Sequence, residues 1–117
     1  MKVDLNLRID GVSIIQPQGR LDLLTAPAIK KQISTAIADG YMHLLIDLAG
    51  VTFMDSSGLG VLLGSLKAAR LAGGDLKIAR ATEQARVILE LTTLNRILVP
   101  YNSVEEALGV FTLLLAQ

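Results

Sequence analysis

The chain has 117 residues and no formal net charge, because eleven basic side chains balance eleven acidic ones. A chain of this length makes one domain, which we place over residues 1–117, and it buries roughly two-thirds of its unfolded surface. The absence of cysteine excludes disulfides and thiolate metal sites and fits a reducing compartment. A neutral chain without a basic patch or aromatic platform is a poor nucleic-acid binder, so no nucleic-acid partner is expected.

The N-terminal residues 1–8 alternate polar and apolar side chains and lack the continuous apolar segment of a signal peptide. No later run reaches the ~20 apolar residues that span a bilayer. We therefore expect a soluble, cytoplasmic protein without membrane insertion. The composition is nevertheless 51% hydrophobic and only 19% charged, with a mean hydropathy of +0.51, so part of the surface is expected to serve a partner.

The first segment of the chain predicts a β-hairpin. Leu5, Leu7 and Ile9 alternate with polar residues in one strand, and residues 12–17 return after a turn at residues 10–11, which read Asp-Gly. The first strand pair is therefore expected to be antiparallel.

The next segment predicts a helix followed by an interior strand. Thr25 suits the N-cap, Pro27 the first turn, and Gly40 the end of the helix. One face of the helix is apolar: Ile29, Ile33 and Ile37. The apolar run over residues 44–48 then predicts a buried strand.

A second helix is predicted by leucines that recur on one helical face, at positions Leu59, Leu62, Leu63 and Leu66. The glycine pair 73–74 ends this helix before a strand over residues 76–78. Thr82 begins a third helix, which carries Ala85, Ile88, Leu89 and Leu91. A short strand over residues 97–99 is expected at a sheet edge, because Pro100 cannot donate to a ladder.

Ser103 and Glu106 have the spacing of a capping box and predict a last helix. Its buried stripe is predicted as Val104, Leu108, Phe111 and Leu115. The alternation of strands and helices predicts an α/β fold, with a mixed sheet of four to five strands and about four α-helices.

The most informative stretch is Phe53-Met54-Asp55-Ser56-Ser57-Gly58-Leu59-Gly60. It places two hydroxyls beside a carboxylate where a strand is expected to lead into a helix. The first N–H groups of a helix have no internal partners and attract anions, so a phosphate on a serine would be favoured there. On the local pattern alone, plain helix capping by a serine or by Asp55 is the favoured interpretation.

At this stretch the sequence resembles the anti-sigma-factor antagonist family, whose STAS domain also occurs in the cytoplasmic tails of sulfate transporters. The family pattern, an apolar-Asp strand followed by V-x-F-M-D-S-S-G-L-G, corresponds to residues 45–60. Flanking features are Gly19-Arg20-Leu21-Asp22 with Thr25-Ala26 upstream and Gly73-Gly74 downstream. The resemblance covers nearly the whole chain and implies a single STAS-like domain.

The resemblance also implies a regulatory protein that is cycled by phosphorylation and is not an enzyme. The family's serine acceptor follows the motif aspartate, which makes Ser56 the expected acceptor. The unphosphorylated antagonist binds an anti-sigma factor that is itself a serine kinase and so frees a sigma factor, and a serine phosphatase reverses the modification. No cofactor and no metal is expected. The expected partner-binding residues are Asp22, Thr25, Asp55, Ser57, Leu59, Gly60 and Gly64.

The sequence also allows other functions. A STAS subunit of a lipid-transport ATPase complex or scaffold would grip its partner without a phosphate switch. A hydrolase using Ser56 is disfavoured, because His43 is the only histidine and Met54 replaces the first glycine of a nucleophile elbow. Asp22 and Thr25 can equally form a turn and a cap. The helical glycines Gly60 and Gly64 either pack closely on the sheet or leave a shallow surface that a partner can approach.

Overall fold

The computed structural model describes residues 2–9 and 11–115, and the side chains among them except those of residues 2–7, 112, 114 and 115. The strands are β1 (Lys2–Ile9), β2 (Val12–Leu21), β3 (His43–Asp47), β4 (Val51–Met54), β5 (Asp75–Ala79) and β6 (Pro100–Tyr101). The helices are α1 (Ala26–Ala38), α2 (Ser56–Leu71), α3 (Glu83–Leu91) and α4 (Val104–Leu115), with a short 3₁₀ helix at Leu94–Arg96.

The strands form one mixed sheet in the order β1-β2-β3-β5-β6, with β4 paired to β2 alone. The hairpin β1–β2 is antiparallel, as predicted, and the other described pairs are parallel. The expected α/β fold with a mixed sheet and four α-helices is therefore confirmed. The sheet has six strands, one more than expected, because β4 was not predicted.

Strand β2 is long enough to have two partners on the same edge. Its first half, residues 13–15, pairs with β3, and its last residues, 19–21, pair with β4. Because β2 and β4 are parallel, their carboxyl ends meet. The loop that follows β2 therefore lies next to the start of α2, which follows β4.

The short C-terminal strand lies slightly later in the chain than predicted. Residues 97–99 are not a strand; they follow the 3₁₀ helix, and the strand is Pro100–Tyr101. Leu98 is buried at 1% exposure even though it lies in an irregular segment. Strand β6 pairs only with β5, so the expected edge position holds, with proline at the first residue, where a ladder tolerates it.

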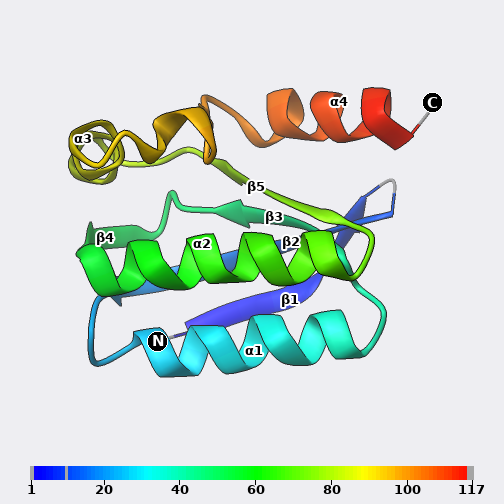
Figure 1. Ribbon diagram of the computed structural model, residues 1–117, viewed down its shortest axis with the longest axis horizontal. Helices are drawn as coiled ribbons and strands as arrows, with labels where there is room; N and C mark the ends of the chain where they lie inside the picture. Colours follow the sequence, from blue (N-terminus) through cyan, green and yellow to red (C-terminus); the bar gives the residue numbers. More distant parts are fainter. Residues whose placement is uncertain (1, 10, 116–117) are drawn as a thin grey trace.

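Helices cover both faces of the sheet, and each face has its own core. The larger core receives side chains from α1, α2 and α3, including Ile33, Leu62 and Leu89. The smaller core lies under α4 and contains Leu45, Ala107 and Phe111. Figure 1 shows α1 and α2 side by side along one side of the strands and α4 along the other.

The predicted ends of the helices are largely confirmed. Gly40 and Gly73 adopt positive φ just after α1 and α2, a conformation that favours glycine. The Thr82 and Ser103 hydroxyls accept hydrogen bonds from the N–H groups of Ala85 and Glu106. Thr25 occupies the N-cap position of α1, but its side chain makes no capping bond, so that part of the prediction is wrong.

The buried side of α4 is partly as predicted. Phe111 is 1% exposed, whereas Val104 and Leu108 are only half-buried, and Ala107, at 0% exposure, belongs to the smaller core. The side chain of Leu115 and the turn residue Asp10 lie outside the described residues.

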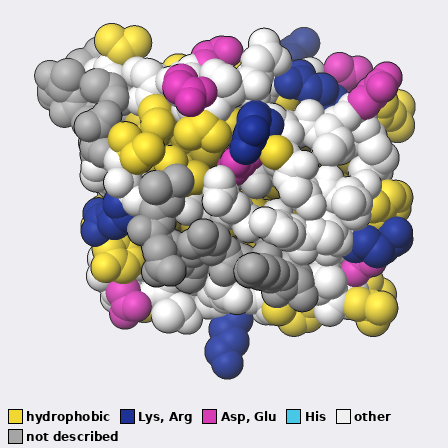
Figure 2. Space-filling model, turned by 180° about the vertical axis from the view of Figure 1, so that it is seen from behind, with side chains coloured by type: hydrophobic (Ala, Val, Ile, Leu, Met, Phe, Trp, Pro, Cys, Tyr) yellow, Lys and Arg dark blue, Asp and Glu magenta, His cyan; other side chains and the backbone are white. Residues whose placement is uncertain are grey.

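In the described part of the chain, no helix has the length and apolar content to cross a membrane. On the far face of the molecule, acidic and basic side chains are scattered among apolar ones (Figure 2).

Candidate functional site

The motif helix α2 begins at Ser56, and Asp55 caps its N-terminus. The Asp55 Oδ1 atom accepts hydrogen bonds from the N–H groups of Ser57, at 2.9 Å, and Gly58, at 3.1 Å. Asp55 thus satisfies two of the N–H groups that a helix start leaves unpaired. The capping that the sequence allowed for a serine is therefore carried out by the carboxylate, and neither Ser56 nor Ser57 is needed for it.

Ser56 is the first residue of α2, and it is exposed. No other described residue forms a hydrogen bond with its hydroxyl. Ser57 is half-buried and is held through its backbone by Asp55. Of the two serines, only Ser56 combines exposure, a free hydroxyl and a place at the positive end of the helix dipole.

The loop between β2 and α1 is closed by Asp22 and Thr25. The Asp22 carboxylate accepts hydrogen bonds from the N–H groups of Leu24 and Thr25 and from Arg20 Nε, each within 3.3 Å. The Thr25 hydroxyl donates to the Arg20 carbonyl at 2.7 Å and accepts from the Asp22 N–H at 2.9 Å. The Arg20 hydrogen bond lowers the pKa of Asp22 below its ordinary value, and the loop hydrogen bonds act in the same direction. Both side chains therefore shape the loop, as the turn interpretation predicted.

This loop joins the start of α2 through two hydrogen bonds. The Leu23 N–H donates to Asp55 Oδ2 at 3.3 Å, and the Asp55 N–H donates to the Leu21 carbonyl, also at 3.3 Å. Leu23 and Leu24 project from the loop with 70% and 88% of their surface exposed. We call Leu23, Leu24, Asp55 and Ser56 the Ser56 surface. On this surface, the two exposed leucines belong to a loop that is hydrogen-bonded to Asp55, the residue next to Ser56.

Gln84 supports this surface from α3. Its side-chain carboxamide accepts a hydrogen bond from the Met54 N–H at 2.9 Å and donates to the Met54 carbonyl at 2.7 Å. The amide thus pairs with the last residue of β4 as a neighbouring strand would. Gln84, Leu23 and Leu24 are not among the site residues that the sequence predicts. The only signal was two leucines between polar residues in a predicted loop, which mark exposed apolar groups.

The predicted partner-binding residues do not all reach the surface. Leu59 is 3% exposed and packs in the larger core, so its side chain cannot contact a partner directly in this structure, and that expectation is corrected. Gly60 and Gly64 are exposed, and a Cβ at either position would meet nothing within 4 Å. Close packing of these two glycines against the sheet is therefore wrong. The close approach occurs at Gly58, where a Cβ would collide with the Leu21 carbonyl oxygen.

The open glycines lead to a prediction about α2. Gly64→Ala is expected to raise the free energy of unfolding by up to about 1 kcal/mol, because alanine favours a helix and the space is free. Gly64→Leu is expected to fold but to weaken the binding of a partner that approaches this side of α2. Melting temperature and partner affinity, measured on both variants, check this. Unchanged affinity for Gly64→Leu would remove Gly64 from the binding surface.

A second polar cluster lies on the α4 face of the sheet. Asp47 is 1% exposed and receives hydrogen bonds from Arg80 Nε at 3.0 Å and Arg80 Nη2 at 2.6 Å, and further ones from Gln16 and the Ala49 N–H. Burial raises the pKa of the Asp47 carboxyl, but these hydrogen bonds and the Arg80 charge outweigh burial and hold the pKa below its usual value. The motif's strand aspartate is thus a structural residue.

Described together, these features define a class of protein: a small α/β domain whose distinctive feature is a strand-to-helix junction with a free serine. The only histidine, His43, begins β3 and packs edge-on against Phe111 with ring centroids 6.3 Å apart. It thus lies at the opposite end of the parallel strands from Ser56 and cannot activate that hydroxyl in this structure. In the described part of the chain, no group of three or more metal-ligating side chains comes together.

Comparison with known proteins identifies the family. The STAS domain model matches residues 6–107, so the chain belongs to the STAS domain family. The anti-sigma F factor antagonist of Paenibacillus polymyxa is 32% identical over 110 residues, which are 89% of this chain and 94% of that protein. The crystal structure of an anti-sigma factor antagonist from Mycobacterium paratuberculosis has a TM-score of 0.79 at 30% identity, covering 93% of this chain and 90% of that one.

A further solved structure shows the same fold at lower identity. The Bacillus cell fate determinant SpoIIAA in its phosphorylated form has a TM-score of 0.72 and 24% identity, covering 94% of this chain and 99% of that chain. At this identity the likeness concerns the fold alone.

Proposed function

We propose that this chain is an anti-sigma-factor antagonist whose binding is switched by phosphorylation of Ser56. In the unphosphorylated state it binds an anti-sigma factor that has serine-kinase activity, and a sigma factor is released for transcription. A serine phosphatase restores the binding form. This function implies a cytoplasmic protein, since sigma factors act on transcription there.

The observation that carries the proposal is the geometry of Ser56. Its hydroxyl is exposed and free of hydrogen bonds from the described residues, while Asp55 takes over the capping of α2. A kinase can therefore reach the hydroxyl without unfolding the helix start. The relatives named as anti-sigma factor antagonists support the partner class, because their sequences align with most of this chain.

The two exposed leucines give a physical reason why a phosphate would matter. Leu23 and Leu24 belong to a loop that is hydrogen-bonded to Asp55, so a partner that buries them also covers the start of α2. A phosphate adds about −1.5 to −2 charges at that place. The dipole of α2 tolerates this charge within the fold, but an apolar contact beside it loses affinity because the phosphate must be desolvated.

The first test is the site of modification. Incubation of the chain with the anti-sigma-factor kinase and ATP is expected to add one phosphate at Ser56, and Ser56→Ala is expected to abolish the modification. Peptide mass spectrometry identifies the site, with Ser57→Ala as the matched control that keeps the phosphate. If a kinase proven active modifies only Ser57, or neither serine, the switch is wrong, and a STAS subunit without a switch becomes the better explanation.

A further inference from the structure

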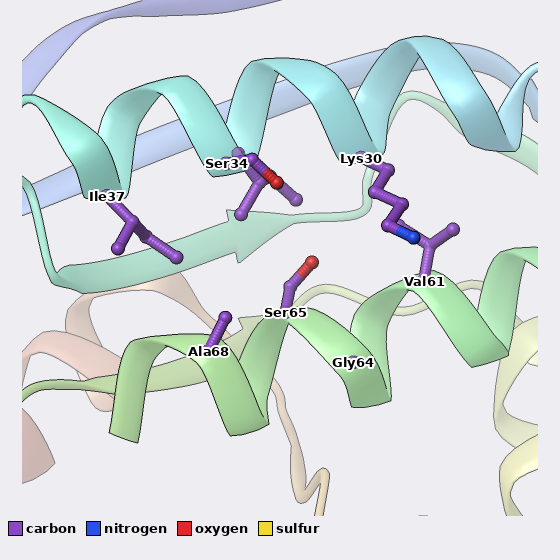
Figure 3. A pocket seen from close by; sticks show the side chains of 8 residues that line it. Lys30, Ser34, Ile37, Val61, Gly64, Ser65 and Ala68 are labelled. Carbon is purple, nitrogen blue, oxygen red and sulfur yellow. The ribbon is translucent and has the colours of Figure 1, made fainter. Parts of the chain in front are cut away.

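A groove of about 210 Å³ lies between α1 and α2, beyond the first turn of α2 and outside the Ser56 surface. Figure 3 shows that side chains from both helices point into it. Ile37 and Ala68 lie at one end of the groove, Ser34 and Ser65 lie in the middle, and Lys30 and Val61 lie at the other end (Figure 3). Ile33 also lines it. Gly64 also lines the groove, and it has no side chain to narrow the groove there.

Ser65 presents a polar group to this groove without an internal partner. The residue is only 6% exposed, and its hydroxyl points into the groove (Figure 3). No other described residue hydrogen-bonds with that hydroxyl. A serine within a helix can bond back to the carbonyl four residues earlier, but Ser65 does not. No side-chain oxygen of the described residues is both buried and without a partner, so the Ser65 hydroxyl is open to the groove and can hydrogen-bond with a ligand there.

The two helices that form the groove carry only positive charge. Neither α1 nor α2 contains an acidic residue, and their basic residues are Lys30, Lys31, Lys67 and Arg70. Arg70 pairs with Asp75, whereas the three lysines form no ion pair with any described residue. Lys30 extends from α1 toward Val61, at the opposite end of the groove from Ile37 and Ala68 (Figure 3). The charge therefore favours an anionic ligand.

The volume limits the size of that ligand. A cavity of about 150 Å³ holds benzene, and sites for drug-sized molecules begin near about 300 Å³. A groove of about 210 Å³ thus accommodates a short alkyl chain. We propose that the groove between α1 and α2 binds a short amphiphilic carboxylate, with its chain against Ile37 and Ala68 and its carboxylate accepting hydrogen bonds from Lys30 and Ser65.

The test is a titration of the full chain, labelled with nitrogen-15, with sodium octanoate below its micelle concentration. Amide shifts are expected to saturate and to be confined to the groove residues of α1 and α2. Lys30→Gln is expected to weaken binding about two- to fivefold, as for an exposed ion pair. Ser65→Ala is expected to weaken it about three- to tenfold, as for one hydrogen bond. Lys31→Gln, which removes a neighbouring charge that does not line the groove, is expected to leave the affinity unchanged.

Three results would overturn the proposal. The first is the absence of saturable shifts at the groove. The second is equal binding of octylammonium, which carries the opposite charge on the same chain. The third is a clear loss of melting temperature in Ser65→Ala, because this would show that the hydroxyl is already bonded within the protein. Ala68→Leu, which fills the apolar end, provides a separate check: if it melts as the parent chain does, it must abolish octanoate binding.

Discussion

Replacing Arg80 with alanine is expected to lower the free energy of unfolding by about 3 kcal/mol at neutral pH. The change leaves the Asp47 carboxylate, which is 1% exposed, without its charged partner. Removing one member of a buried pair costs about 3–5 kcal/mol, and the lower end applies because the Arg80 side chain is 48% exposed. Urea denaturation measures the loss. Arg70→Ala, which breaks the exposed pair with Asp75, is the matched control and is expected to cost less than about 1 kcal/mol.

The stability loss in Arg80→Ala is also expected to depend on pH. In the parent chain the pKa of Asp47 is lowered from 3.8, so its stabilising contribution is present above that pH and is lost as the pH falls further. In Arg80→Ala, burial acts without the Arg80 hydrogen bonds, and the pKa of Asp47 is expected to rise above its unfolded value. The deficit relative to the parent should then be largest at neutral pH and shrink in acid. A small, pH-independent deficit would contradict the buried pair as described.

Gly58→Ala is expected to destabilise the fold by about 2–3 kcal/mol. A Cβ at this position would meet the Leu21 carbonyl and lie 2.7 Å from the Leu21 Cγ atom, so the first turn of α2 would have to move away from β2. Gly60→Ala lies two residues later in open space and is expected to raise stability by up to about 1 kcal/mol. Urea unfolding of both variants gives the comparison. Equal stabilities for the two would mean that α2 is not seated on the end of β2.

The helix ends and the strand-to-helix junction could be predicted because their causes are local. Gly40, Gly73 and Thr82 act through their own backbone or the next turn, and the sequence carries that information. Strand β4 was not predicted, because its four residues are buried at both ends and do not alternate clearly between buried and exposed side chains. It becomes a strand through its pairing with the end of β2, a contact between residues about thirty positions apart.

Features of the site that involve neighbouring residues could be predicted from the sequence. Contacts between residues far apart in the sequence could not. Asp55 and Ser56 stand next to each other in the motif, so their positions at a helix start could be inferred. Gln84 bonds to Met54 from thirty residues away, and Leu23 meets Asp55 across 32, so neither contact leaves a sequence pattern. Leu59 was expected both in the buried leucine stripe and at the partner surface. One side chain cannot be buried in the core and also contact a partner, and the Leu59 side chain is buried in the core.

The central claim is that one phosphate at Ser56 switches partner binding without disturbing the fold. The most direct test is the affinity of the chain for its anti-sigma-factor kinase before and after phosphorylation, measured by calorimetry with a nonhydrolysable nucleotide so that the modification state stays fixed. We expect the affinity to fall at least about tenfold, a loss of about 1.4 kcal/mol, while the melting temperature stays close to that of the unmodified chain. Equal affinities of the two forms, or a phosphorylated chain that no longer melts cooperatively, would contradict the account.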